Sequence, residues 1–160
     1  DMKRWSFNLQ IYFLNSRLRH IVEFQKHNVN IIQDRTIYED AYIFAENLYD
    51  MGLMSERDFK NYSNIFESIL SYIRPPDLLI YLKASVPTLV DNIQLRGREY
   101  ESGIRLDYLS KLNEKYEKWI NGYKDGKLLV LDKDKLDFAN KPEDLGYVIQ
   151  RIEAELFGLF

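Results

Sequence analysis

Short apolar runs separated by long helical patterns constrain the fold of this chain most strongly. Nearly every residue is apolar at 78–82 and at 128–131, and a β-branched run covers 28–33. Strands that are apolar on both faces are typical of parallel sheets, which helices cover on both sides. The sequence therefore predicts an α/β protein with a parallel sheet flanked by helices.

Apolar residues at helical spacing fill the intervals between these runs. Hydroxyl caps and acidic first turns, as at Ser55, mark where helices begin, and Pro75 and Pro76 mark where one must end. The predicted helices cover about 4–27, 37–49, 55–73, 87–95, 106–121 and 142–156.

The length and composition predict one domain. The chain has 160 residues, of which 46% are hydrophobic, and it contains no repeat and no linker. Three strands are few for a parallel sheet, and the chain starts at Asp1 rather than at methionine. We therefore expect a single domain over 1–160 that lacks a first strand at its N-terminal end.

Charge and cysteine content exclude several functions. Lys and Arg number 22 against 25 Asp and Glu, which disfavours sequence-independent binding of a nucleic-acid polymer or an anionic membrane. The absence of cysteine excludes disulfides and thiolate catalysis, and two histidines make no metal site. No apolar run approaches the roughly 18 residues of a membrane helix. We expect a soluble, cytoplasmic protein.

The first candidate site is the stretch Asp34-Arg35-Thr36, which follows the β-branched run. Ligands of parallel sheets bind at the carboxyl ends of strands. The planar fork of Arg35 suits a phosphate, and the carboxylate of Asp34 can hold Mg²⁺ directly or through water. The alternative is an ordinary ion pair at the end of a strand.

Two further candidates lie on helices or beside them. Arg96 and Arg98 flank Gly97, as in a lid that closes on a phosphoryl group, although a solvated charge run explains that stretch alone more simply. Gln10 and Arg17 are two helical turns apart and share a face, where Gln suits the edge of a nucleobase. Arg17 can pair with a carboxylate such as Asp40, or it can point to water.

Taken together, these stretches resemble the deoxynucleoside kinase family. The resemblance is carried by residues 4–12, by 34–44, and by 95–98 with Glu101, in that order and spacing. It implies that Gln10 hydrogen-bonds the base, that Arg17 and Asp40 form a second base-contacting pair, and that Phe44 packs on the base. Leu9 stands where the family often has an aromatic residue.

The resemblance also assigns the phosphoryl-transfer groups. Arg35 would lie by the 5′-oxygen and the transferred phosphoryl, and Asp34 would help to position Mg²⁺. Glu101 would accept a hydrogen bond from the sugar 3′-hydroxyl. The donor, ATP, would meet a further set of residues: Arg96 and Arg98 on its phosphates, and Asp137 and Phe138 near its adenine.

The sequence departs from the family at its start. The family's first strand, its Gly-rich phosphate loop with lysine and its acidic general base would precede Asp1, and no GxxxxGK[ST] motif occurs in the chain. The chain alone is therefore expected to be inactive, as most of a P-loop-kinase-like domain cut from a longer polypeptide. The family also dimerises through helices, which predicts a homodimer.

The predicted function is ATP-dependent phosphorylation of a deoxynucleoside 5′-hydroxyl in nucleotide salvage. The resemblance implies that the Arg17 and Asp40 pair disfavours thymidine, because family members that prefer thymidine tend to replace these charged groups. The motifs look most like those of the bacterial purine deoxynucleoside kinases, which implies deoxyadenosine or deoxyguanosine, with deoxycytidine as the alternative substrate. Two other hypotheses remain open. One is a nucleoside monophosphate kinase such as thymidylate kinase, and the other is a non-catalytic nucleoside-binding module.

Overall fold

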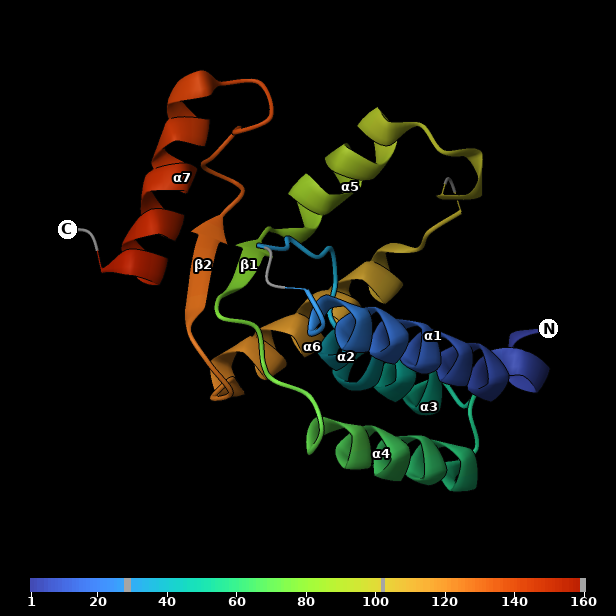
Figure 1. Cartoon of the computed structure of the whole chain (residues 1–160). Helices are drawn as coiled ribbons and strands as arrows, with labels where there is room; N and C mark the ends of the chain where they lie inside the picture. The colour runs from blue at the N-terminus through green and yellow to red at the C-terminus, as the bar shows by residue number, and fades with distance from the viewer. Residues whose placement is uncertain (28–29, 102, 159–160) are drawn as a thin grey trace. The chain divides into compact units, whose positions relative to one another are not determined.

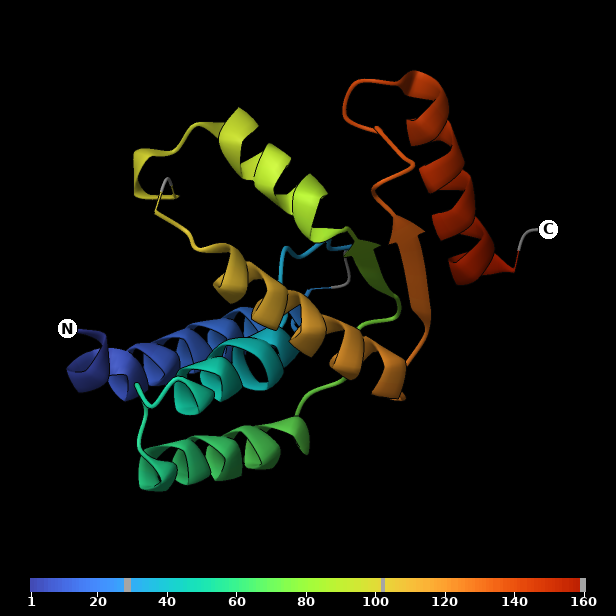
Figure 2. The same ribbon diagram turned by 180° about the vertical axis from the view of Figure 1, so that it is seen from behind.

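A computed structural model describes residues 1–27, 30–101 and 103–158, with only the backbone of Tyr100. The chain forms two compact units, Asp1–Arg74 and Pro75–Phe160. Figures 1 and 2 show the elements of each unit from opposite sides. The expectation of a single domain stays a prediction.

The first unit is helical. Helix α1 covers Met2–Phe24 and is followed by α2 (Ile37–Glu39), η1 (Asp40–Ala45), α3 (Glu46–Asp50) and α4 (Glu56–Leu70). The segment from α2 to α3 runs antiparallel to α1 and to α4 (Figure 1). The helical expectations for 4–27, 37–49 and 55–73 are confirmed, with ends that differ by a few residues.

Helices α2, η1 and α3 are one continuous helical segment with a widened turn in its middle. Thr36 begins it with a capping box, in which its side chain accepts from the Tyr38 amide while Glu39 accepts from the Thr36 amide. In η1 the Glu46 amide reaches the Ala41 carbonyl, a π-helical hydrogen bond. Such turns are rare and often lie at functional sites.

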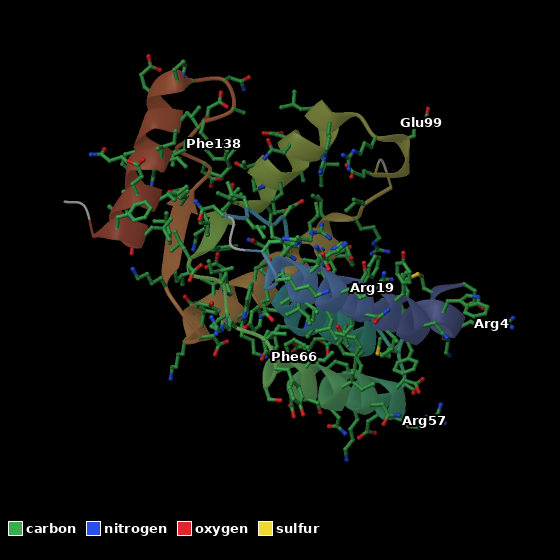
Figure 3. The ribbon with its side chains drawn as sticks, in the orientation of Figure 1. Arg4, Arg19, Arg57, Phe66, Glu99 and Phe138 are labelled. Carbon is green, nitrogen blue, oxygen red and sulfur yellow. The ribbon has the colours of Figure 1, made fainter. Side chains whose placement is uncertain are left out.

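The core of this unit lies where α4 meets the segment from α2 to η1. Tyr62 and Phe66 are one helical turn apart and almost fully buried. The Phe66 ring meets Tyr38 and Tyr42 edge-on, with centroids 6.3 and 5.3 Å away. Phe66 accordingly lies on the side of α4 that faces the other helices (Figure 3).

The strand expected at 28–33 is wrong for residues 30–33, while 28–29 lie outside the described residues. Residues 30–33 belong to no strand, and Ile32 is 100% exposed. A strand needs the backbone hydrogen bonds of a neighbour, and no strand in the described part of the chain pairs with this segment. Apolar composition alone therefore did not produce a strand here.

The second unit is α/β. Strands β1 (Leu79–Lys83) and β2 (Leu128–Asp132) pair in parallel, with Leu79 opposite Leu128. Between them lie α5 (Val86–Arg96), the 3₁₀ turn η2 (Glu99–Glu101) and α6 (Leu106–Gly122), and α7 (Pro142–Phe157) follows β2. The two strands and three helices expected for this region are confirmed, the helices as α5, α6 and α7.

Helices cover both faces of this sheet. On one face Leu129 and Leu131 pack with Val148 of α7. On the other face Tyr81 stacks on Tyr116 of α6, with ring centroids 5.9 Å apart. Successive residues of a strand point to opposite faces, so these contacts place α6 and α7 on opposite sides. The predicted α/β class with a parallel sheet flanked by helices is confirmed.

The strands are less buried than their composition predicts. Ile80, Leu82 and Val130 are 36%, 48% and 43% exposed. The described sheet has two strands, so each strand lacks a neighbour on one side and its side chains have fewer residues to pack against. No helix among the described residues is long and apolar enough to cross a membrane.

Candidate functional site

Helix α1 presents one face to the interior of the first unit. Ser6, Gln10 and Leu14 recur at four-residue spacing and are all buried. The Ser6 hydroxyl donates to the Leu53 carbonyl at 2.6 Å, which anchors the helix. Gln10 is 4% exposed, and its Oε1 finds no hydrogen-bond partner among the described residues. A buried amide oxygen without a partner is costly, so Gln10 is suited to a ligand donor.

Arg17 lies two turns further along α1 and joins two segments. Its Nε contacts Asp40 Oδ2 at 3.3 Å, and its Nη1 donates to the Asp34 carbonyl at 3.1 Å. The side chain of Arg17 is 22% exposed and that of Asp40 is 7% exposed. The geometry therefore brings Arg17 to Asp40, and the alternative in which Arg17 simply points to water does not hold.

Two adjacent carboxyl groups lie buried at the start of the π turn. Burial raises the pKa of Asp40, while the charges of Arg17 and Arg35 act against the rise. Burial also raises the pKa of Glu39, and its hydrogen bonds from Thr36 oppose this. Arg17 therefore helps to keep Asp40 ionised in a site where a lone carboxylate would be poorly solvated.

Tyr62 faces the same region from α4. Burial, with the charge of Asp40, raises the pKa of Tyr62 far above its ordinary value, so the phenol keeps its proton. Its hydroxyl is buried and lacks a hydrogen-bond partner among the described residues. Tyr62 thus adds a further unpaired polar atom to the interior of this unit, in addition to that of Gln10.

Arg35 has an unusual backbone. Its φ is +61°, and it alone among the described residues other than glycine has a positive φ. Its guanidinium carbon lies 4.8 Å from the centroid of the Phe44 ring, a cation–π contact. Arg35 and Phe44, which the sequence assigned to different parts of a substrate, therefore contact one another.

Asp34 and Leu9 lie at the surface of the first unit. Asp34 follows residues 30–33, which form no strand, and it is exposed. No group of three metal-ligating side chains occurs in the described ranges. A single exposed carboxylate nevertheless suits Mg²⁺, which usually keeps several waters and binds substrate phosphates. Leu9 is 37% exposed and points away from the buried Gln10, because adjacent helical residues lie about 100° apart.

The lid residues of the second unit share one carboxylate. Arg96 ends α5, Gly97 follows in the left-handed region with φ +62°, and the chain turns into η2. Arg96 Nε lies 3.2 Å from Glu101 Oε2, and Arg98 Nη1 lies 3.4 Å from Glu101 Oε1. The arginines are about half exposed, whereas the Glu101 side chain is 11% exposed.

Asp137 and Phe138 lie in the loop between β2 and α7. The Asp137 amide donates to Asp144 Oδ2 at 2.7 Å, and the Asn140 side chain donates to the Asp137 carboxylate. Phe138 packs against the core under α7, with Lys133 Nζ 5.3 Å from its ring centroid (Figure 3). This loop is therefore held by its own hydrogen bonds.

Some residues of the site were not anticipated. Thr36 and Glu39 have the spacing of a capping box, a signal that was present in the sequence. Tyr62 could have been found from its four-residue spacing to Phe66 on an apolar face. The π turn and the Arg35–Phe44 contact have no comparable sequence signal, because both depend on how the helices pack.

Comparisons with known proteins identify the family. The model of the deoxynucleoside kinase family matches residues 1–157. A deoxyadenosine/deoxycytidine kinase of Bacillus subtilis is 36% identical over 154 residues, which cover 95% of this chain and 71% of that protein. A deoxyguanosine kinase of Lactobacillus johnsonii is 34% identical, with 96% and 72% of the two chains covered.

A solved structure agrees with these sequence relatives. The deoxyadenosine kinase of M. mycoides superposes with a TM-score of 0.81 and 28% identity, covering 96% of this chain and 77% of that one. A deoxyadenosine kinase of Dictyostelium discoideum is 38% identical over 120 residues, and this chain covers 49% of its length. The chain belongs to the deoxynucleoside kinase family, whose members are phosphotransferases acting on deoxynucleosides.

Proposed function

We propose that this protein transfers the γ-phosphoryl group of ATP to the 5′-hydroxyl of a deoxynucleoside in nucleotide salvage, with purine deoxynucleosides preferred. The observation that carries the proposal is the partly buried pair of Arg17 and Asp40, in which Arg17 shares a face of α1 with Gln10. Burying a charged pair costs free energy, which is offset where the pair binds a ligand. The donors of Arg17 and the acceptor oxygens of Asp40 match the hydrogen-bonding edge of a base.

The base-contacting groups have distinct roles in this proposal. Gln10 presents a buried amide whose oxygen is unpaired, so it can accept from an exocyclic amine and donate to a ring nitrogen. Arg17 and Asp40 meet the other part of the base edge. Phe44 packs on the face of the base, and Leu9 lines the position that the family often fills with an aromatic residue.

Phosphoryl transfer depends on positioning and on neutralising charge. Arg35 is assigned to the 5′-oxygen and the transferred phosphoryl, and Asp34 to Mg²⁺, which would supply positive charge to neutralise the phosphates of ATP. Arg96 and Arg98 are assigned to the donor phosphates. Both contact Glu101 in the described structure, which brings the groups assigned to the donor phosphates next to the carboxylate assigned to the sugar 3′-hydroxyl.

The remaining assignments concern the donor base and the assembly. Asp137 and Phe138 are placed near the adenine of ATP. The α1 helix exposes Trp5 (52%), Tyr12 (66%) and Phe13 (40%), which suits a helix-mediated homodimer. A cytoplasmic location completes the proposal, since salvage kinases need the cellular ATP pool.

Deoxycytidine is the second candidate substrate. The Bacillus subtilis relative is named a deoxyadenosine/deoxycytidine kinase, and the solved relative from M. mycoides has been seen with dATP and with dCTP. Adenine and cytosine both carry an exocyclic amine next to a ring acceptor, so one Gln side chain can serve either base.

A coupled ATP-consumption assay on the natural protein in full tests the proposal. Deoxyadenosine, deoxyguanosine, deoxycytidine and thymidine are compared side by side. Turnover of purines with little turnover of thymidine is expected. Turnover of thymidine alone would contradict the base assignment, and binding of deoxynucleosides without turnover would favour a non-catalytic binding module.

A further inference from the structure

The guanidinium of Arg17 contacts two segments that carry different parts of the proposed site. Its Nε lies 3.3 Å from the Asp40 carboxylate in η1, and its Nη1 donates to the Asp34 carbonyl at 3.1 Å. The nitrogens belong to one rigid plane. A rotation of this plane toward a base edge therefore changes both contacts at once.

The carbonyl that Arg17 holds belongs to the peptide bond that leads into Arg35. Arg35 has φ +61°, a region that is unfavourable for residues with a Cβ atom. Such a conformation persists where surrounding contacts impose it. Arg17 supplies a contact on the N-terminal side of Arg35.

Another contact lies on the C-terminal side. The Thr36 amide donates to Glu39 Oε2 at 2.7 Å, within the capping box. The Arg35 side chain itself rests over the Phe44 ring. The backbone of Arg35 thus lies between the Asp34 carbonyl, which Arg17 binds, and the Thr36 amide, which Glu39 binds. Its guanidinium is positioned by the cation–π contact with Phe44.

We propose that Arg17 is a positioning residue for Arg35, and that its bond to the Asp34 carbonyl links base recognition to phosphoryl transfer. The inference rests on the proposed kinase function for the roles of the two arginines. A base that fits Arg17 and Asp40 leaves the Asp34 contact intact. A base that turns the guanidinium weakens that contact and displaces Arg35.

Two variants separate base recognition from positioning. Arg17→Lys keeps a positive charge beside Asp40, but one ammonium cannot reproduce two bonds in a fixed plane. Asp40→Asn removes the negative charge but keeps a side-chain oxygen that can accept from Arg17 Nε, so the guanidinium plane and its bond to the Asp34 carbonyl are retained. Arg19→Lys is the matched control, because Arg19 is an exposed arginine on the same helix (Figure 3).

Steady-state kinetics of the natural protein in full give the first test. Arg17→Lys should lower kcat for the preferred deoxynucleoside by about 10- to 100-fold with a smaller change in KM, as expected for a misplaced catalytic group. Asp40→Asn should instead raise KM for the preferred deoxynucleoside, because it weakens a base-contacting group. A loss in Arg17→Lys that lies only in KM would overturn the proposal.

Hydrogen exchange at the Thr36 amide gives a second test that needs no turnover. This amide should exchange about tenfold faster in Arg17→Lys, and at the unchanged rate in Asp40→Asn and in Arg19→Lys. The Phe66 amide in α4 is the reference for general destabilisation. Unchanged Thr36 protection in Arg17→Lys would overturn the positioning role.

The two tests also separate this inference from the proposed function. If the unmodified protein turns over no deoxynucleoside, the proposed function fails, whereas selective loss of Thr36 protection in Arg17→Lys would still support the positioning contact. If the unmodified protein is active but Arg17→Lys retains both kcat and Thr36 protection, the proposed function stands and the positioning role is refuted.

Discussion

Asp40→Asn is the substitution that most directly tests the base-contacting pair. Asparagine keeps the size of the side chain and one acceptor oxygen but removes the charge that faces Arg17 Nε at 3.3 Å. The Asp40 side chain is 7% exposed, so solvent cannot replace the lost charge. The substitution therefore changes the electrostatics of the site with little change in its shape.

The expected effect on base selection is larger than the effect on stability. A well-placed hydrogen-bonding pair discriminates between bases by about 1–3 kcal/mol. Loss of the charge should remove about half of that, since neutral hydrogen bonds are roughly half as strong. At about 1.4 kcal/mol per tenfold, this is a change of about 2- to 12-fold in the ratio of kcat/KM values.

The cost in folding free energy should be about 1 kcal/mol or less. Breaking a fully buried ion pair costs several kcal/mol, but Arg17 is 22% exposed and can be hydrated. Burial also raises the pKa of Asp40, so the carboxylate is only partly compensated by its partner in the unmodified protein. Replacing the carboxylate therefore removes the desolvation penalty of a buried charge as well as the ion pair with Arg17.

The assay is the kcat/KM of deoxyadenosine divided by that of thymidine, measured for the natural protein in full and for Asp40→Asn. Asp58→Asn is the control, because Asp58 is an acidic residue on α4 paired with the exposed Arg57. The ratio should fall for Asp40→Asn alone. An unchanged ratio in a variant that keeps its helical circular dichroism would refute the base-contacting role.

Three further predictions concern catalysis, packing and pH. Arg35→Ala should lower kcat by about 100-fold or more with a smaller change in nucleoside affinity, and equal losses in both would contradict its assignment. Phe66→Ala should cost about 3–5 kcal/mol in denaturant unfolding, whereas Ile65→Ala, at a position 43% exposed, should cost about 1 kcal/mol or less. Burial raises the folded-state pKa of Glu39 above 4.5. The unfolding free energy of the unmodified protein, measured relative to that of Glu39→Gln, should therefore fall as the pH rises from about 4 through that raised pKa. A difference in unfolding free energy that does not depend on pH would contradict this.

The regular elements followed from local signals in the chain. The helices α1, α4 and α7 have apolar residues at helical spacing, and α4 also has the Ser55 cap. Strands β1 and β2 were found from apolar runs flanked by turns. Caps and periodicity act within a few residues of one another, so these features could be predicted without knowledge of distant contacts.

The run at 28–33 shows where local signals end. Its composition matches that of β1 and β2, yet residues 30–33 form no strand and Ile32 is fully exposed. A strand forms only where a neighbour accepts and donates its backbone hydrogen bonds. Composition does not contain that partner, whereas β1 and β2 have each other.

The candidate site likewise has some features that could be predicted from local sequence signals and others that depend on tertiary packing. The residue types, the shared face of Gln10 and Arg17, and the resemblance to deoxynucleoside kinases could all be inferred from the chain. The contacts of Arg17 with Asp40 and with the Asp34 carbonyl could not, nor could the left-handed backbone of Arg35 and its position on the Phe44 ring. These contacts join residues up to 23 positions apart, so they depend on how α1 packs against the following segment. Hydrogen-bond geometry and burial arise from that packing, which no local pattern of residues specifies.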